Sequence, residues 1–254
     1  MGIERRTGDP AWGDGAEAPA NRLRAQRRTE VLDRRCTFET AGAELVMLQK
    51  GDVLSRTPDH VQLVKFGWAI ERSVEREGKS FASALYLPGE LVFPHAVEGD
   101  GALFKARMLT DGAVYRLEDL DCMSTSAAVE AMLMDALLAA HSWERRRAVA
   151  IGSYSGRDRL IHFLLDIRER LGSANAGSNR FFLPLTQGDI ATCLGVTPVY
   201  LNRLVGQLNR QGVIEFRHRH VRILDREALE RMIGVPSPAD HPADPGPAEP
   251  DRRV

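Results

Sequence analysis

The segment from Leu185 to Asp225 constrains the fold more than any other part of the chain. It reads LTQGDIATCLGVTPVYLNRLVGQLNRQGVIEFRHRHVRILD, which is two amphipathic stretches separated by a short turn and followed by two short apolar runs. Apolar residues that recur every three or four positions predict helices, and short β-branched runs predict strands. The segment is therefore expected to form a winged helix-turn-helix, a motif whose second helix enters the major groove of DNA.

Helix-capping signals support this interpretation at both helices. Thr186 precedes the first helix and Asp189 follows three residues later, which is the spacing of a capping box. Gly195 suits a turn that requires a positive φ. Thr197 and Pro198 indicate the start of the second helix, because Thr is a good N-cap and proline is favoured at the first helical position.

The second helix is expected to bury an apolar stripe made of Leu201, Leu204, Val205 and Leu208. The residues left outward near its start, Val199, Asn202 and Arg203, are our candidates for reading bases. Arginine can bind guanine through two hydrogen bonds, asparagine can pair with adenine, and an apolar side chain can meet a thymine methyl group. The alternative is that Asn202 and Arg203 only solvate an exposed helix face.

A basic tip, Arg-His-Arg-His at positions 217–220, lies between the two expected strands of the wing. Such a tip usually rests on the phosphate backbone, so Arg217 and Arg219 are candidates for phosphate contacts. Thr186, Gln187 and Thr197 join them because helix N-termini attract phosphate groups. The alternative for the tip is a solvated hairpin loop.

On these residues the segment resembles the DNA-binding domain of the CRP/FNR superfamily of transcription regulators. The resemblance rests on the Thr186 cap, the Leu194-Gly195 turn and Arg203 one turn into the second helix. It implies a guanine contact for Arg203. Many members carry a glutamate that reads cytosine where this chain has Val199, so that base preference is not carried over.

The region from about Val31 to Leu120 alternates short apolar runs with Gly, Pro and Asp, which predicts a β-sandwich or jelly roll. The resemblance implies a sensor domain like those that bind cyclic nucleotides, with Gly89-Glu90-Leu91 at the start of the phosphate-binding cassette. Between Val92 and Lys105, however, no Arg-Ser or Arg-Thr pair supplies the groups that a cyclic phosphate needs. We therefore predict no cofactor and argue against cyclic AMP as the ligand.

A long helix is expected from about Leu120 to Ala150. Its broad apolar stripe predicts a coiled-coil-like contact between two copies of the chain. The residues assigned to this dimer interface are Val129, Met132, Ala136, Ala140 and Trp143. The alternative is that the stripe packs on its own β domain, and both contacts can hold in part.

The expected organisation is an α+β chain with five parts. These are a disordered arm over 1–29, a β-jelly-roll sensor-like domain over 30–119, a dimerisation helix and hinge over 120–152, a winged helix-turn-helix domain over 153–234 and a disordered tail over 235–254. The net charge of the chain is −1, yet residues 153–234 hold twelve Arg against eight Asp and Glu. A local basic excess of this kind is what DNA affinity requires.

Other chemistries find little support in the sequence. The three cysteines, Cys36, Cys122 and Cys193, are far apart, which disfavours a zinc site, an iron–sulfur cluster or a disulfide framework and fits a reducing cytoplasm. A redox switch at Cys36 or Cys122 and haem ligation by His95 stay open as alternatives. Enzyme motifs, an apolar run long enough for a membrane span and a signal-peptide core are all lacking, so we predict neither an enzyme nor a membrane protein.

The sequence as a whole predicts a homodimeric regulator that binds palindromic double-stranded DNA, with RNA polymerase as a further partner if it activates promoters. One alternative is a small-molecule or haem sensor whose ligand gates DNA binding. The other is a dimeric interaction protein that does not bind DNA.

Overall fold

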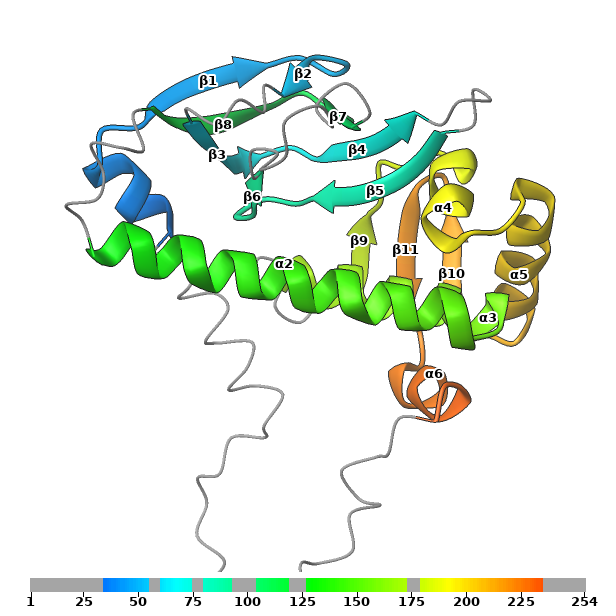
Figure 1. Cartoon of the computed structure of the whole chain (residues 1–254). Coiled ribbons are helices and arrows are strands. Elements are labelled where there is room, and N and C mark those ends of the chain that lie inside the picture. Colours follow the sequence, from blue (N-terminus) through cyan, green and yellow to red (C-terminus); the bar gives the residue numbers. More distant parts are fainter. Residues whose placement is uncertain are drawn as a thin grey trace, which may run out of the picture.

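The computed structural model describes residues 34–54, 60–74, 80–92, 104–118, 127–172 and 179–234. The expected arm over 1–29 and the tail over 235–254 lie outside these ranges, as do His95 and Cys122. Figure 1 shows a β domain and a smaller α/β domain, both lying along one side of a long helix.

The β domain consists of two antiparallel four-stranded sheets. The first has the order β1-β8-β3-β6 and contains β1 (Glu44–Leu48), β8 (Gly112–Glu118), β3 (His60–Phe66) and β6 (Leu91–Val92). The second has the order β2-β7-β4-β5 and contains β2 (Val53–Leu54), β7 (Phe104–Met108), β4 (Ala69–Val74) and β5 (Ser80–Tyr86). A short helix over residues 34–40 precedes them. The expected jelly-roll type of sandwich, and with it the α+β fold class, is confirmed.

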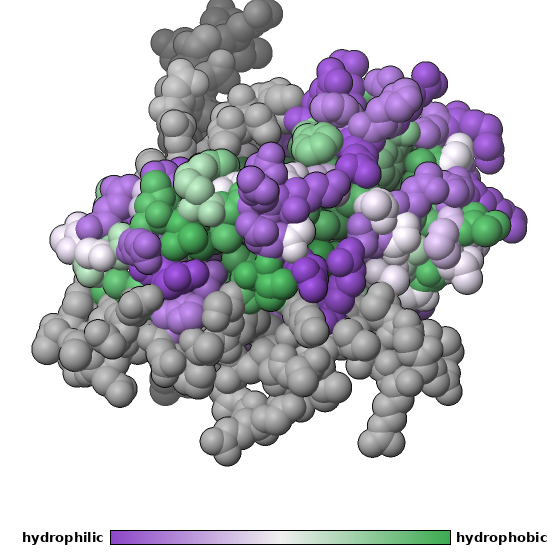
Figure 2. Space-filling model, turned by 90° about the horizontal axis from the view of Figure 1, so that it is seen from above, coloured by the Kyte–Doolittle hydropathy of each residue, from purple (hydrophilic) through white to green (hydrophobic). Residues whose placement is uncertain are grey.

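The surface of this domain is partly apolar. Seen from above in Figure 2, hydrophobic side chains show over much of the β-domain side of the molecule. The large apolar side chains exposed on its strands are Leu45, Met47, Val53 and Phe66.

The long helix, α2 (Ala127–Ser153), uses its apolar stripe within its own chain. Val129, Met132 and Ala136 are buried in one cluster with Phe38 and Leu63 of the β domain. These three residues were expected at a dimer interface, and the structure instead places them in an intrachain core. The physical reason is that the apolar face of the first sheet has to be covered, and α2 lies directly against it.

The rest of that stripe is half-buried. Ala140 is intermediate in exposure, and Trp143 donates a hydrogen bond of 2.7 Å from Nε1 to Asp166 on the next helix. The large apolar residues that α2 exposes in its first half are different ones, Met134, Leu137 and Leu138.

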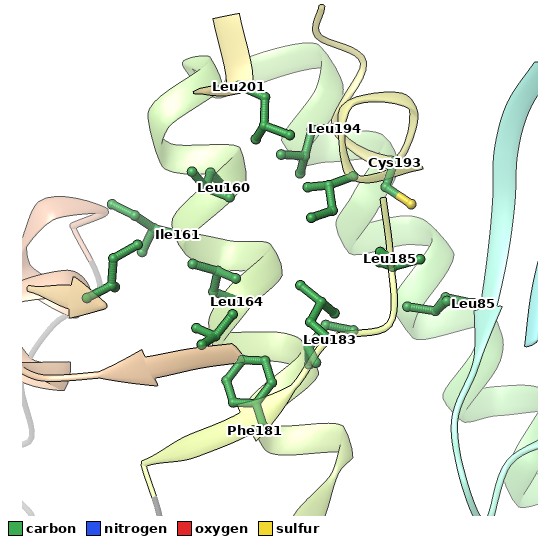
Figure 3. Close-up of a cluster of buried hydrophobic side chains, with 14 of the residues drawn as sticks. Leu85, Leu160, Ile161, Leu164, Phe181, Leu183, Leu185, Cys193, Leu194 and Leu201 are labelled. Atoms are coloured by element: carbon green, nitrogen blue, oxygen red, sulfur yellow. The ribbon is translucent and has the colours of Figure 1, made fainter. Parts of the chain in front are cut away.

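The C-terminal domain follows a break at Tyr154, close to the expected hinge. It contains α3 (Gly156–Arg170), β9 (Arg180–Phe182), α4 (Gln187–Leu194), α5 (Pro198–Arg210), β10 (Ile214–Arg217), β11 (His220–Ile223) and α6 (Arg226–Met232). The three strands form an antiparallel sheet with the order β10-β11-β9. Figure 3 shows how side chains from α3, α4, α5 and the strand region around Phe181 point into one core.

The two domains share this core. Leu85 of β5 lies near Leu185 and Cys193 in Figure 3, and it belongs with them to one buried cluster. At the same boundary Arg147 of α2 donates hydrogen bonds to the carbonyl oxygens of Ala82 and Ser83. Apolar packing therefore places the C-terminal domain on the β domain, and the Arg147 hydrogen bonds hold the second half of α2 to β5.

None of the described helices is long and apolar enough to cross a membrane. No group of three His, Cys, Asp or Glu residues in the described ranges is placed to hold a metal ion.

Candidate nucleic-acid interface

Helix α4 begins with the capping box that its sequence predicts. The Thr186 hydroxyl accepts a hydrogen bond of 3.1 Å from the amide of Asp189, and the Asp189 carboxylate accepts one of 2.9 Å from the amide of Thr186. The helix ends at Gly195, which has φ +64° as a left-handed C-cap. The turn to the next helix is thus positioned by local hydrogen bonds and by the glycine backbone.

Helix α5 presents one polar and one apolar side. The Thr197 hydroxyl caps it by accepting from the Tyr200 amide at 3.2 Å, and Pro198 occupies its first turn. The buried side consists of Leu201, Leu204 and Leu208. On the opposite side Val199 is 81% exposed, and Asn202 and Arg203 are also exposed.

Asn202 is tied to the helix before it. Its side-chain amide donates a hydrogen bond of 2.8 Å to the Gln187 side-chain oxygen at the start of α4. A candidate base-reading residue and a candidate phosphate-contacting residue are therefore in direct contact. This contact orients the Asn202 side chain before any ligand arrives.

The wing hairpin turns through His218 and Arg219, which join β10 to β11. Both residues have positive φ, +49° and +65°. This is the backbone of a type I′ turn, which normally favours Asn-Gly because side chains disfavour that region. The Arg219 carbonyl accepts a hydrogen bond of 2.7 Å from the Leu183 amide, which anchors the turn to the strand region behind it.

A groove of about 600 Å³ lies between the start of α4, the polar side of α5 and the wing. We call it the recognition groove. Its lining brings together five of the candidate residues, namely Thr186, Gln187, Asn202, Arg217 and Arg219. The described residues that line it include no Asp or Glu, so the groove favours a polyanion. Val199, Thr197 and Arg203 do not line it and lie on the neighbouring exposed part of α5.

Sequence reasoning missed one polar contact at this interface. Arg72 of β4 forms an ion pair with Asp189, the same carboxylate that completes the α4 capping box. Burial by itself would raise the pKa of Asp189, but the hydrogen bonds from Thr186 and Arg72 bring that pKa below its ordinary value. The β domain thus touches the N-terminus of the first helix of the helix-turn-helix. No local pattern could reveal this, because the two residues are 117 positions apart.

Comparisons with known proteins agree with this geometry. The model of the Crp-like helix-turn-helix domain matches residues 158–232. The chain is 26% identical over 200 residues to the transcriptional regulatory protein btr of Bordetella pertussis. The aligned region covers 76% of this chain and 83% of that protein. It is 23% identical to the fumarate and nitrate reduction regulatory protein of Vibrio cholerae, over 74% of this chain and 78% of the relative.

A solved structure has the same architecture. FixK2 from Bradyrhizobium japonicum superposes with a TM-score of 0.66 at 20% sequence identity, covering 74% of this chain and 96% of that one. The match extends beyond any single one of the β domain, the long helix and the helix-turn-helix domain, because none of them spans three quarters of the chain. Residues 158–232 thus match a Crp-like helix-turn-helix domain, and about three quarters of the chain is similar to transcription regulators such as btr and the fumarate and nitrate reduction regulatory protein.

Proposed function

We propose that this protein regulates transcription as a homodimer that binds palindromic DNA through α5 of each copy. The observation that carries the proposal is the division of α5, whose leucine side is buried while Asn202 and Arg203 stand exposed beside a groove without acidic lining. A helix anchored on one side and polar on the other is what major-groove recognition requires.

In this proposal Arg203 binds guanine, Asn202 binds adenine and Val199 meets a thymine methyl group. The exposure of all three supports these roles. Asn202 keeps its contact with Gln187 in the free protein, so it enters the DNA groove with its amide already oriented. Such pre-orientation lowers the entropy that binding costs.

Phosphate contacts are assigned to Thr186, Gln187 and Thr197 at the two helix N-termini and to Arg217 and Arg219 on the wing. The helix N-termini offer backbone amides and a positive dipole end to a phosphate. The wing offers two exposed guanidinium groups. These contacts position the domain on the duplex but carry no sequence information.

The dimer is assigned to α2, but through a different face from the one that the sequence indicated. Met134 is 57% exposed, Leu137 50% and Leu138 56%, and a surface helix gains from covering such residues. Ala140 and Trp143 lie at the edge of the intrachain contact. Pairing two copies along α2 would set two α5 helices about one DNA turn, roughly 34 Å, apart on a palindrome.

The proposed role is binding and not catalysis. A regulator of this kind acts on chromosomal DNA in the cytoplasm, and RNA polymerase is its partner if it activates promoters. The β domain and α2 supply the frame, and no cofactor is assigned to them.

The test of base reading uses DNA selected from a random pool by the full-length protein. Arg203→Ala should weaken binding to the selected site by about 5- to 150-fold, which corresponds to the roughly 1–3 kcal/mol of one bidentate base contact. Binding to random DNA should keep most of its salt-dependent affinity. Arg210→Ala, an exposed arginine at the far end of the same helix, is the matched control and should retain the discrimination. Equal losses on selected and random DNA for Arg203→Ala would contradict the assignment.

The test of the dimer is sedimentation of the full chain. Leu138→Glu should shift the protein toward monomer, because a buried unpaired carboxylate opposes association. Ala139→Glu, also exposed and one position along α2, points to another side of the helix and should leave the dimer intact. A Leu138→Glu protein that stays as dimeric as the wild type would refute the α2 contact.

A further inference from the structure

A second cavity lies away from the DNA-facing side, where α2, α3 and the end of α4 meet β5. We call it the junction cavity, and its volume is about 230 Å³. Its walls are mostly apolar, and they include four rings and two aliphatic side chains: Trp143, Tyr154, His162, Phe163, Leu85 and Val149. It opens to solvent beside Val149 and Tyr154, which are 49% and 37% exposed.

The rings make the cavity suited to a flat molecule. Tyr154 and His162 are stacked, with ring centroids 4.7 Å apart and planes inclined by 13°. Only 6% of the whole chain is Phe, Trp or Tyr, so three of these residues around one small cavity are a marked concentration. Flat rings pack best against other rings in offset or edge-to-face arrangements.

The size of the junction cavity limits the ligand. An apolar cavity of about 150 Å³ can hold benzene. At about 230 Å³ the junction cavity has room for a ring that carries a further small group, or for two fused rings.

The lining of the junction cavity carries more positive than negative side chains, which favours an anionic ligand. Three arginines and one aspartate line the cavity: Arg146, Arg147, Arg159 and Asp166. Arg147 and Arg159 are held by backbone carbonyls, at Ala82 and Leu194 among others. Arg146 is different, since its side chain is 62% exposed and its contact with Asp166 is 3.8 Å, longer than a hydrogen bond.

Asp166 is already engaged and does not neutralise the rim. Its carboxylate accepts the 2.7 Å hydrogen bond from Trp143 and lies 3.5 Å from Arg170. Arg146 is therefore placed to turn toward an anionic group that arrives at the mouth of the cavity. A guanidinium can bind a carboxylate with two parallel hydrogen bonds.

Two ionisable side chains of the wall, His162 and Cys193, are shifted toward their uncharged forms. Burial lowers the pKa of His162, which Asp158 and Asp166 only partly oppose. Burial also raises the pKa of the Cys193 thiol to about 11. At neutral pH these two side chains are therefore uncharged, and the charges of the lining come from its arginines and Asp166. Clusters of perturbed groups in one cavity are typical of binding sites.

We propose that the junction cavity binds a small aromatic carboxylate whose ring system has about six to nine non-hydrogen atoms, an upper size that follows from comparison with the benzene cavity. The aromatic ring lies among Trp143, Tyr154 and Phe163, and the carboxylate meets Arg146 at the mouth. Benzoate, phenylacetate and indole-3-carboxylate have this form. The site shares no lining residue with the recognition groove.

The test is calorimetric titration of the full-length protein with these three acids, with benzyl alcohol as a neutral analogue. At least one acid should bind saturably, with one site per chain. Ala150→Trp, which places an indole in the cavity, should weaken that binding by about tenfold or more, because overlap of this kind excludes the ligand. Ala139→Trp on an exposed part of α2 that does not line the cavity should leave the affinity unchanged.

A second pair of variants tests the charge. Arg146→Gln should weaken the acid about three- to fivefold, in keeping with an exposed ion pair, and should leave benzyl alcohol unaffected. Arg145→Gln, the neighbouring exposed arginine outside the lining, should change neither. If Ala150→Trp does not fold, Val149→Trp fills the cavity from its exposed rim and should have the same effect.

Three results would overturn the proposal. These are no saturable binding by any of the acids, unchanged binding in the variants that fill the cavity, and unchanged carboxylate affinity in Arg146→Gln. None of these results depends on whether Arg203 reads DNA, so this proposal and the proposed function fail separately.

Discussion

The guanidinium of Arg170 in α3 lies 2.7 Å and 2.9 Å from the two carboxylate oxygens of Glu90 in the β domain. The Arg170 side chain is only 9% exposed, and Glu90 also accepts a hydrogen bond from the Leu87 amide. The acidic residue of the Gly89-Glu90-Leu91 segment is thus paired inside the protein, by a residue of the C-terminal domain. Burial opposes the charge of Arg170, but Glu90 and Asp166 raise its pKa above the ordinary value, so the charge is retained.

This pairing leads to a prediction about cyclic AMP. A cyclic nucleotide would have to compete with Arg170 for Glu90, and the segment between Val92 and Lys105 supplies no Arg-Ser or Arg-Thr pair for the phosphate. We expect millimolar cyclic AMP to leave the melting temperature of the protein unchanged, because a ligand stabilises only the state that binds it. A saturable rise in melting temperature would show that the β domain binds the nucleotide after all.

Arg170→Ala should destabilise the whole chain. It leaves the Glu90 carboxylate without its main partner, and the loss of one member of a buried pair costs about 3 kcal/mol in free energy of unfolding. Urea denaturation measures this value. Arg226→Ala breaks the exposed Arg226–Glu230 pair of α6 and, as a control, should cost less than about 0.5 kcal/mol. Similar losses for the two variants would mean that the Arg170 pair contributes no more than a surface pair does.

In the wing turn, His218 and Arg219 should lower the stability of the fold, while Arg219 should raise the affinity for DNA. Replacing His218 and Arg219 by Asn and Gly gives the residues that a type I′ turn favours, and it should raise the free energy of unfolding by about 0.5–1 kcal/mol. The same double variant removes one cation from the wing. Its affinity should therefore fall alike for all DNA sequences, and the dependence of affinity on salt should flatten by about one unit of slope.

The single variant His218→Asn separates the effect on stability from the effect on DNA affinity. It relieves strain at one position and keeps Arg219, so it should gain part of the stability without the loss in salt dependence. A change in base preference in the double variant would argue against a phosphate role for Arg219.

The two described cysteines should differ in reactivity. Cys36 is exposed, whereas Cys193 is buried in α4 with its pKa raised to about 11. Iodoacetamide at pH 8 should modify Cys36 in the native protein and Cys193 only after unfolding, since the thiolate is the reactive form. Peptide mass spectrometry reads out each site. Rapid native modification of Cys193 would show that α4 opens readily.

The same pKa shift has a consequence at high pH. The folded state holds the Cys193 proton more tightly than the unfolded chain does, so its contribution to stability is complete below pH 9.0. It is lost as the pH rises from there toward 11. Denaturation curves across this interval should show falling stability.

The sequence alone determined the helix-turn-helix. The Thr186–Asp189 box, the Gly195 turn and the Thr197–Pro198 start are read correctly because each depends on neighbours within four residues. The exposure of Asn202 and Arg203 follows from the same helical period, because burying the leucines fixes the opposite side. The wing hairpin was also predictable, although its left-handed turn at His218 was not, since neither turn residue is glycine.

Only the tertiary structure decided which surfaces those elements meet. The apolar stripe of α2 is compatible with a second copy or with the chain's own sheet, and the fold assigned Val129, Met132 and Ala136 to the sheet. The Arg72–Asp189 and Arg170–Glu90 pairs join residues 80 or more positions apart, and the junction cavity brings Leu85 of β5 to residues of α2, α3 and α4. Periodicity and capping describe what one helix or strand prefers, whereas partners are chosen by the packing of whole faces against each other.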